Sequence, residues 1–549
     1  MKSISSDDLD VTETVDKPSE GKKINCEVPC IKIVEGGMND TMAQIDAAIN
    51  SRSGRNIYQR SGRVVYVKQV KMPTWQKGVS TNIQHIVSME KEHLTAMLEG
   101  VCTLVKFNKK TNKWLPVSCP DKLAEVYLKN ARELPYIGAI INAPTILSDG
   151  SIVENPGYDP GSELLFDPKG MAFPRIPPEP SEDAACAALK VLQGPIAYFP
   201  FEGETPKKRN SVSRSVALAG MITPLIRSSL PTAPMIAYTA PETGTGKSLL
   251  TDINSILMSG VQAAVISQGY RDDELDKRID TALIEGRQLI SIDNCERQLQ
   301  SDVLCQVLTQ PHRGVRILGL SKSITVPTNV NVNCNGNNLS MHTDLIRRSV
   351  LCTIDAKVEN PSKRKFPFDP VQFVTKHRPR LVVAALTILR AYQITNRKVK
   401  LDPLGSFEAW SARVREALVW LGLEDPCSSQ ERLREKDTRK GTLASVMAAW
   451  RAHPDLGNSK HTAAEVIQIV AAPSPLVNMF PVDASASDNL HQELIATVLR
   501  RGDRQLNPHN LGNWLMKVAD QVIDGEKFKR VDYNRHTRVS YWQIVPGNE

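Results

Sequence analysis

A glycine-bearing loop followed by lysine and serine contains the residues of this sequence best suited to chemistry. The segment 240–250 has the sequence Ala-Pro-Glu-Thr-Gly-Thr-Gly-Lys-Ser-Leu-Leu. Its glycines let backbone N–H groups turn inward around the phosphates of a nucleotide, Lys247 can reach the β and γ phosphates, and Ser248 offers a hydroxyl to Mg²⁺. We therefore expect ATP and Mg²⁺ to bind here, through Thr243, Gly244, Thr245, Gly246, Lys247, Ser248 and Leu249.

The flanking segments have the patterns needed to hold such a loop. Apolar residues 235–238 predict a buried strand, and apolar side chains at helical spacing begin at Ser248, so the phosphates would meet a helix N-terminus. Pro241 occupies the position where this motif usually has its first glycine. The alternative is a chance Gly-Lys-Ser in an ordinary loop, which the strand before it and the helix after it disfavour.

An acidic position for the metal is expected at the end of a second strand. Residues 288–294 form an apolar run that reaches Asp293, a Walker B pattern, and this carboxylate would hold Mg²⁺ through water beside the serine of the loop. A turn residue or a helix cap is the alternative interpretation. The next position, where a glutamate often orients the attacking water, is Asn294, so Glu296 is the nearest candidate base and Glu285 a second one.

A third strand is expected to carry a γ-phosphate sensor. Residues 326–334 predict this strand, which leads into an Asn-Gly-Asn-Asn sequence. ATPases of the AAA+ class place a polar side chain at this strand tip, so Asn337 is the expected sensor and Asn338 the alternative, unless these residues only build a turn. Arg347 and Arg348 follow, and either could act as a finger on the γ phosphate of a neighbouring subunit while the other forms a surface ion pair.

Two basic segments are candidates for contact with nucleic acid. Between the second and third strands, apolar alternation around 319–323 predicts a hairpin with Lys322 at its tip and Arg313 and Arg316 behind it. These side chains would contact phosphates of single-stranded DNA without reading its sequence; a solvated hairpin is the alternative.

The second basic segment lies near the C-terminal end. Expected helices at 490–500 and 511–523 and strands at 528–531 and 539–544 have the order of a winged-helix module. Basic and aromatic side chains mix around the last two strands, which suits backbone contact and base stacking, although the basic face of a protein-interaction module is the alternative. The basic residues are Lys527, Lys529, Arg530, Arg535 and Arg538.

Length and composition limit the remaining possibilities. The 549 residues, 41% hydrophobic and 23% charged, are ordinary for a soluble globular protein of about three or four domains. The net charge of +8 is mild for this length and does not by itself indicate nucleic acid. No apolar run approaches the roughly 20 residues of a membrane span, the first residues lack a signal-peptide core, and the ten cysteines do not have zinc-site spacing. A cytoplasmic location is expected.

Together these segments resemble the replicative helicases of phages and integrated mobile elements, the superfamily 3-like and minichromosome-maintenance-like branch of AAA+ ATPases. The resemblance covers about 180–430 and rests on the residues at 240–248, 290–294, 336–339 and 344–348, with further likeness to prophage primase-helicase proteins at 351–370 and 409–422. It implies a hexameric ring that hydrolyses ATP and moves on single-stranded or forked DNA, with a primase or another replication protein as a partner. Asn294 departs from the usual Asp-Glu pair, and no primase metal site is present in the sequence pattern.

We therefore expect an α/β protein with a P-loop AAA+ core, an N-terminal α+β domain and a C-terminal helical and winged-helix region. The function implied is that of an ATP-dependent DNA helicase. The alternatives are an AAA+ loader or remodeller that does not unwind DNA, and a DNA-binding scaffold with a silent ATPase. The expected parts are a disordered tail at 1–25, the N-terminal domain at 26–166, a proline-rich linker at 167–183, the ATPase domain at 184–400, a helical lid at 401–480 and a winged-helix-like domain at 481–549.

Overall fold

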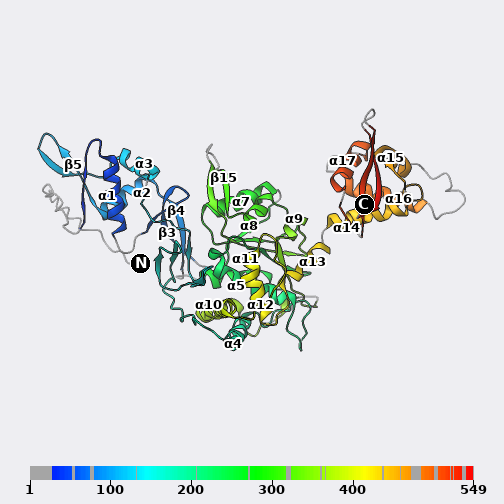
Figure 1. Cartoon of the computed structure of the whole chain (residues 1–549), viewed down its shortest axis with the longest axis horizontal. Coiled ribbons are helices and arrows are strands. Elements are labelled where there is room, and N and C mark those ends of the chain that lie inside the picture. The colour runs from blue at the N-terminus through cyan, green and yellow to red at the C-terminus, as the bar shows by residue number, and fades with distance from the viewer. Residues whose placement is uncertain are drawn as a thin grey trace, which may run out of the picture. The chain divides into compact units, whose positions relative to one another are not determined.

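The structure is a computed structural model of a mixed α/β protein (Figure 1). Its described residues form three hydrophobic cores. The expected tail at 1–25 lies outside the described residues. The structure describes residues 28–51, 56–73, 80–130, 133–205, 207–269, 272–316, 323–358, 361–364, 366–435, 438–457, 459–471, 484–499, 505–519, 521–523, 525–534 and 539–547.

The N-terminal unit extends to residue 138 and packs its helices on a small sheet. Two three-stranded sheets have the orders β1-β5-β6 and β2-β3-β4. Ile31, Leu94 and Leu104 are among the buried residues that join the helices to the first sheet. The elements are β1 (Cys30–Ile33), α1 (Met38–Asn50), β2 (Ile57–Arg60), β3 (Arg63–Pro73), β4 (Ser80–Ser88), α2 (Lys91–Val101), β5 (Thr103–Asn108), β6 (Lys113–Pro116) and α3 (Asp121–Asn130).

Residues 139–166 belong to the second unit, so the N-terminal domain ends before the expected boundary at 166. The physical reason is burial. Ala143 and Ile146 lie in the core of the second unit, and Gln288 Nε2 donates to the carbonyl oxygen of Ile140 at 2.6 Å. The short strands here are β7 (Ala139–Ile141), β8 (Thr145–Ile146), β9 (Ile152–Val153), β10 (Gly157–Asp159) and β11 (Leu164–Phe166).

A five-stranded parallel sheet with the order β13-β14-β17-β12-β18 lies at the centre of the second unit. After β12 the chain continues to β13 at one edge of the sheet. After β17, the neighbour of β12, it continues to β18 at the opposite edge. Open α/β sheets bind ligands where such connections diverge, beyond the carboxyl ends of the strands. The elements are β12 (Met235–Ala240), α6 (Lys247–Ser259), β13 (Val265–Ser267), α7 (Asp272–Ile284), β14 (Leu289–Asp293), α8 (Asp302–Thr309), β15 (His312–Arg316), β16 (Ser323–Pro327), β17 (Asn331–Asn337), α9 (Thr343–Ile346) and β18 (Ser349–Thr353).

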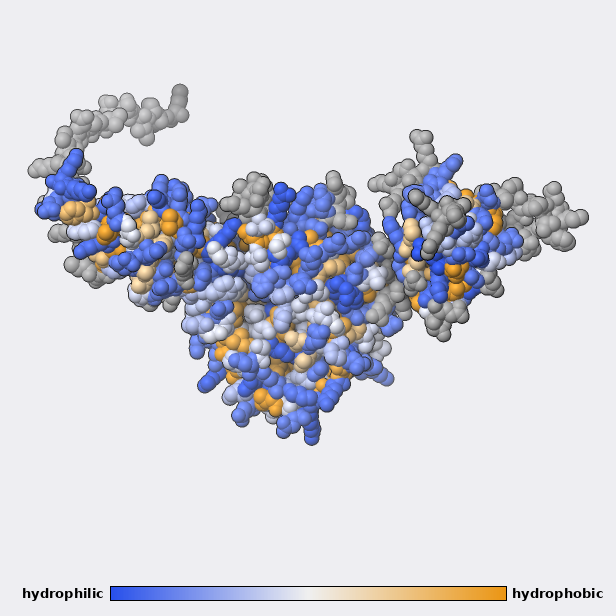
Figure 2. All heavy atoms as spheres, turned by 45° about the horizontal axis from the view of Figure 1, so that its top comes forward, coloured by the Kyte–Doolittle hydropathy of each residue, from blue (hydrophilic) through white to orange (hydrophobic). Residues whose placement is uncertain are grey.

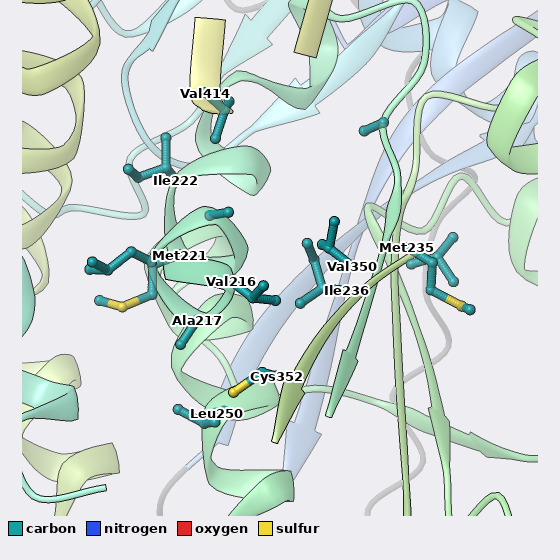
Figure 3. Packing of buried hydrophobic residues seen from close by; sticks show 14 of the residues in the cluster. Val216, Ala217, Met221, Ile222, Met235, Ile236, Leu250, Val350, Cys352 and Val414 are labelled. Atoms are coloured by element: carbon teal, nitrogen blue, oxygen red, sulfur yellow. The ribbon is translucent and has the colours of Figure 1, made fainter. Parts of the chain in front are cut away.

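Helix α5 (Val212–Ile226) and α6 pack against this sheet through apolar side chains. Strand β12 is buried along its whole length, and α5 is buried on nearly all sides because other helices cover the faces that the sheet does not. Figure 3 shows Val216 of α5 pointing toward Ile236 of β12 and Val350 of β18. The strand that precedes the glycine loop is therefore buried on both faces.

The proline-rich segment 167–181 is packed on the second unit rather than spanning two domains. Ile176 is buried in the core, and Arg390 Nε donates to the carbonyl oxygen of Pro178 at 2.8 Å. Residues 407–433 are buried in the same core through Trp410 and Leu433, so the first part of the expected lid belongs to this domain. The helices are α4 (Glu182–Gln193), α10 (Pro370–Ile394), α11 (Glu408–Trp410), α12 (Glu416–Trp420) and α13 (Ser429–Glu435), with a π-helical turn at Ser411–Arg415.

The C-terminal module has a core of its own that begins with α14. Helices α14 and α15 share buried residues with the segments that follow 481, so the expected boundary at 481 runs through this core. Trp450 of α14 packs edge-on against Phe528 of β20, with ring centroids 5.1 Å apart. The sheet order is β19-β21-β20. The elements are α14 (Thr438–Ala452), β19 (His461–Thr462), α15 (Ala463–Ala471), α16 (Ala484–Val498), α17 (Pro508–Val518), β20 (Glu526–Asn534) and β21 (Val539–Pro546).

Figure 2 shows the hydropathy of the residues on one face of the molecule. Hydrophilic residues cover most of the visible face, with hydrophobic ones scattered among them (Figure 2). Among the described helices, none combines the length and the apolar character needed to cross a bilayer.

Candidate nucleotide-binding site

The glycine loop lies between β12 and α6, at the point where the sheet connections diverge. The expected strand and helix on its two sides are confirmed. Gly244 and Gly246 have φ angles of 73° and 104°, in the left-handed region that glycine adopts without strain. Gly246 is also the N-cap of α6, and because it has no side chain, the N–H groups of the first helical turn can be satisfied by an anion.

Aromatic side chains support this loop, a feature that the sequence pattern did not assign to the site. A Cβ atom on Gly246 would lie 3.0 Å from Cε1 of Phe199. The ring of Phe199 packs against Phe201 and Phe366 at centroid distances of 6.0 and 5.2 Å. The glycine is therefore required both for its φ angle and for the close approach of this aromatic cluster.

The ammonium group of Lys247 points along the loop toward the end of β17. Its Nζ donates to Asn337 Oδ1 at 2.7 Å and to the carbonyl oxygen of Glu242 at 3.2 Å, with Thr245 Oγ1 at 3.5 Å. Partial burial lowers the pKa of Lys247, and the negative charge of Asp293 partly offsets this shift. The lysine is thus partly desolvated and near the second strand end before any ligand binds.

Ser248 contacts a residue that the sequence analysis missed. Asn335 Nδ2 donates to Ser248 Oγ at 3.3 Å, while Asn335 itself is only 1% exposed. Within the described residues, its Oδ1 atom has no hydrogen-bond partner. Asn335 and Asn337 are two positions apart on β17, so their side chains lie on the same face of the strand. This alternation is the sequence signal that could have identified Asn335.

Strand β14 ends at Asp293 as expected, on the strand adjacent to β17. Asp293 Oδ1 accepts the backbone N–H of Asn294 at 3.0 Å, and the N–H of Cys295 donates to the Asn335 carbonyl at 2.9 Å. Asn294 has a φ of 54°, and its Nδ2 donates to Glu296 Oε1 at 2.7 Å. The candidate base Glu296 is exposed, and its carboxylate is oriented by Asn294.

The two alternative residues make contacts of a different kind. Asn338, with a φ of 45°, reaches the carbonyl oxygen of Pro241 at 3.5 Å. Glu285 pairs with Arg287 at 2.6 Å. Asn337 is thus the strand-tip amide that contacts the loop lysine, and its role as a sensor stays a prediction.

Arg347 and Arg348 follow α9 and both contact Asp344, at 3.2 and 3.1 Å. Their exposure separates them, because 57% of the Arg347 side chain is accessible but only 13% of Arg348. Hydrogen bonds from Arg348 first, and then from Arg347, lower the pKa of Asp344. The exposed Arg347 is the one that could reach another molecule.

The expected basic hairpin is formed by β15 and β16, which pair antiparallel. Lys322 lies outside the described residues. Arg313 donates to Asp280 of α7 at 2.8 Å and is 14% exposed, so its guanidinium is already neutralised within the domain. Arg316 is exposed at the end of β15 and is the described basic side chain nearest the tip.

Three of the C-terminal basic residues, Lys527, Lys529 and Arg530, lie on β20. Lys527 and Lys529 flank the buried Phe528 and so lie on the other face of the strand. Arg530 is exposed, and its guanidinium lies 5.6 Å from the ring centroid of Tyr533. Arg535 and Arg538 lie outside the described residues.

The donor set near the loop fits Mg²⁺ better than a transition metal. In the described parts of the chain, no group of three or more His, Cys, Asp or Glu side chains is arranged to hold a metal ion. Mg²⁺ needs only one or two protein oxygens together with water and phosphate oxygens. The Ser248 hydroxyl and the Asp293 carboxylate supply donors of this kind.

Comparison with known proteins does not assign the chain to a family. No family model and no curated protein sequence matches it. Two solved structures of the NrS-1 C-terminal region, both apo A forms, align over 82% and 83% of this chain and over 99% and 100% of their own length. Sequence identity is 11% and the TM-score 0.35 in both cases, values too low to transfer fold or function.

Proposed function

We propose that this chain binds Mg-ATP at the loop between β12 and α6 and hydrolyses it as the P-loop AAA+ core of a DNA helicase. The observation that carries the proposal is the meeting of Lys247, Asn337 and Asp293 at the carboxyl ends of three neighbouring strands. A cation, an amide and a carboxylate at such an edge suit a nucleotide triphosphate. Its setting would be the replication of a phage-like or mobile genetic element.

Each residue would have a separate task in hydrolysis. Lys247 neutralises charge on the β and γ phosphates, and its contact with Asn337 keeps the amide at the position that the γ phosphate would approach. Ser248 directly, and Asp293 through water, would hold Mg²⁺, which would supply charge neutralisation at the phosphate oxygens. Glu296, oriented by Asn294, accepts the proton of the attacking water.

The proposal extends to a ring of subunits, a hexamer, that moves on single-stranded or forked DNA. The exposed Arg347 would enter the site of the neighbouring subunit, where a guanidinium stabilises the charge that spreads over the γ phosphate. Arg316 and Lys322 on the hairpin, and the basic strand β20 in a winged-helix-like module, would contact DNA phosphates. A primase or another replication protein would be the partner.

The pairing of Asn294 with Glu296 favours one second candidate function. If the amide holds Glu296 away from water, the site would bind ATP and turn it over slowly or not at all. The chain would then be an ATP-dependent loader or remodeller, or a scaffold on DNA, and would not unwind a duplex.

Strand displacement on a forked DNA substrate tests the proposal. The unchanged chain should separate the strands only with ATP and Mg²⁺, and Lys247→Ala should not separate them. Multi-angle light scattering with ATP should give the mass of a hexamer. A chain that hydrolyses ATP yet leaves the fork paired would support the loader or remodeller instead.

A further inference from the structure

The hairpin β5–β6 of the N-terminal unit displays two large aromatic rings to solvent. Phe107 and Trp114 are directly opposite each other in the register of the two strands, so both point to the same face of the sheet. Their rings meet edge-on with centroids 5.5 Å apart, yet 41% of Phe107 and 38% of Trp114 remain exposed. Aromatic side chains of this size usually bury their surface, so an exposed pair indicates a binding surface.

This face points away from the core of the unit. Leu104 and Ile31 are buried among the helices, and strand alternation places Val105 and Phe107 on the opposite face. Lys32 of β1 pairs in register with Val105, and its Nζ lies 5.2 Å from the Trp114 ring centroid. The sheet β1-β5-β6 therefore has a helix-covered face and a second, open face, on which the ammonium group of Lys32 and the rings of Phe107 and Trp114 are exposed beside the buried Val105.

Positive charge is concentrated on the hairpin β5–β6: Lys109 and Lys110 lie in its turn, and Lys106 and Lys113 lie on the strands, on the face opposite to Phe107 and Trp114. Between Thr103 and Pro116 the chain contains four lysines and no Asp or Glu. All four are exposed, and in the described part of the chain none is paired with a carboxylate. They are Lys106, Lys109, Lys110 and Lys113.

The turn that carries two of these lysines has a defined conformation. Asn108 Oδ1 accepts the backbone N–H groups of Lys110 and Thr111 at 2.9 and 3.3 Å, and Asn112 takes a φ of 51°. Such asparagine-centred turns fix the backbone. Lys109 and Lys110 are thereby held just beyond the Phe107–Trp114 pair.

We propose that this open face, which we call the β5–β6 platform (Lys32, Phe107, Lys109, Lys110 and Trp114), binds single-stranded DNA. Unpaired bases would stack on the two rings, while the turn lysines contact the phosphates, a combination that holds single strands without reading their sequence. The charge complementarity disfavours an apolar or basic protein partner, and a paired duplex would offer no base face to the rings. The choice of DNA rests on the proposed function, whereas the platform itself does not depend on ATP hydrolysis.

Photocrosslinking locates the bound strand directly. The full chain, without nucleotide, is mixed with a thymidine oligonucleotide that contains 5-iododeoxyuridine, irradiated, and digested for mass spectrometry. Crosslinks should map to peptides that contain Phe107 or Trp114. Trp114→Ala should remove the Trp114 crosslink and weaken binding at that site about tenfold or more, since each stacked base contributes substantially.

Two further variants control for folding. Leu115→Ala removes an equally exposed apolar side chain from the same strand on the opposite face, and it should leave crosslinking unchanged. Lys109→Glu with Lys110→Glu changes only the exposed turn. This double variant should reduce crosslinking and lower the slope of log Kd against log salt by about 0.7 for each phosphate that the lysines no longer neutralise.

The outcomes separate this inference from the proposed function. Crosslinks confined to other parts of the chain, or unaffected by Trp114→Ala, would overturn the platform, as would duplex DNA that competes equally with the single strand. Preferential crosslinking of the matching oligouridine would overturn the assignment to DNA. The crosslinking needs no ATP and can be repeated with Lys247→Ala, so it does not depend on the proposed ATPase. If the platform binds DNA but the unchanged chain does not hydrolyse ATP in a separate assay, only the proposed motor function is overturned.

Discussion

Lys247 Nζ lies 2.7 Å from Asn337 Oδ1, which joins the first residue of α6 to the last residue of β17. Ninety positions of sequence separate the two residues. The contact links the loop expected to hold the phosphates to the strand tip expected to sense the γ phosphate. It is the geometric basis of the proposed ATPase site.

Replacing Asn337 should impair hydrolysis more than binding. Asn337→Ala keeps Lys247 and the loop glycines, so nucleotide affinity should change little, whereas kcat should fall about 10²-fold because a preorganised polar group is removed. Fluorescent-nucleotide titration and steady-state phosphate release measure the two effects separately. Asn338→Ala is the matched control and should leave both unchanged; equal losses in the two variants would contradict the role of Asn337.

We expect Arg347 to contribute little to the stability of the fold and Arg348 to stabilise it. Arg347→Ala removes a side chain that is 57% exposed, so its free energy of unfolding should change by less than about 1 kcal/mol. Arg348→Ala removes a side chain that is only 13% exposed, together with its hydrogen bond to the carbonyl oxygen of Asp344, and should cost about 1–3 kcal/mol. Denaturant titration measures both.

Hydrolysis by mixed subunits tests whether Arg347 acts across an interface. Arg347→Ala alone should be inactive, and so should Lys247→Ala. Mixing them should restore part of the activity, because some sites would combine an intact loop with an intact arginine. Mixtures as inactive as the separate variants would contradict a finger that acts in a neighbouring subunit.

Gly336→Ala should destabilise the site from within the sheet. A Cβ atom at this position would lie 2.4 Å from the carbonyl oxygen of Cys295, a backbone atom that cannot turn aside. Overpacking of this kind costs about 1–3 kcal/mol, and it would move the segment after Asp293. Gly314→Ala, in open space on β15, is the control for thermal unfolding. Equal melting temperatures in the two variants would argue against the close packing of β17 on Cys295.

The C-terminal module should lose stability in mild acid through His453. Burial lowers the pKa of this imidazole below its usual 6.5, while Asp455 opposes the shift and His461 adds to it. As the pH falls through 6.5 the unfolded state takes up the proton first, so the free energy of unfolding decreases until the lower folded pKa is passed. His453→Gln should flatten this dependence.

Fluorine NMR of the 5-fluorotryptophan-labelled chain can follow the module through Trp450 and Trp542, both buried in its core. In the unchanged chain, the midpoint temperature of thermal unfolding should decrease when the pH is lowered from 7.5 to 5.5. The exposed His509 provides the control, and His509→Gln should keep the full pH dependence. A dependence that survives in His453→Gln would assign the effect to another group.

Local patterns predicted the elements of the fold better than its domain boundaries. The strand and helix around the glycine loop and the final hairpin follow from apolar periodicity, and the structure contains them. The boundaries at 166 and 481 differ because burial across distant segments decides them. Ile146 and Trp450 each join a core whose other members lie far away in the sequence, which local periodicity does not register.

In the candidate site, too, local sequence patterns predicted some residues, whereas contacts between distant segments could not be predicted. Motif spacing predicted roles for Lys247 and Asp293, which stay predictions, and the structure brings Asn337 to the lysine. The role of Asn335 behind Ser248 and the support of Gly246 by Phe199 depend on contacts between separate elements. The β5–β6 platform also escaped notice, because exposure of aromatic side chains is a property of the folded sheet.

Steady-state ATP hydrolysis by the full chain, with and without single-stranded DNA, tests the central claim most directly. We predict turnover that requires Mg²⁺, rises when DNA is added, and falls by at least about 10²-fold in Lys247→Ala. Hydrolysis that persists in Lys247→Ala, or that is absent from the unchanged chain in its assembled form with DNA, would contradict an ATP-driven motor built on this loop.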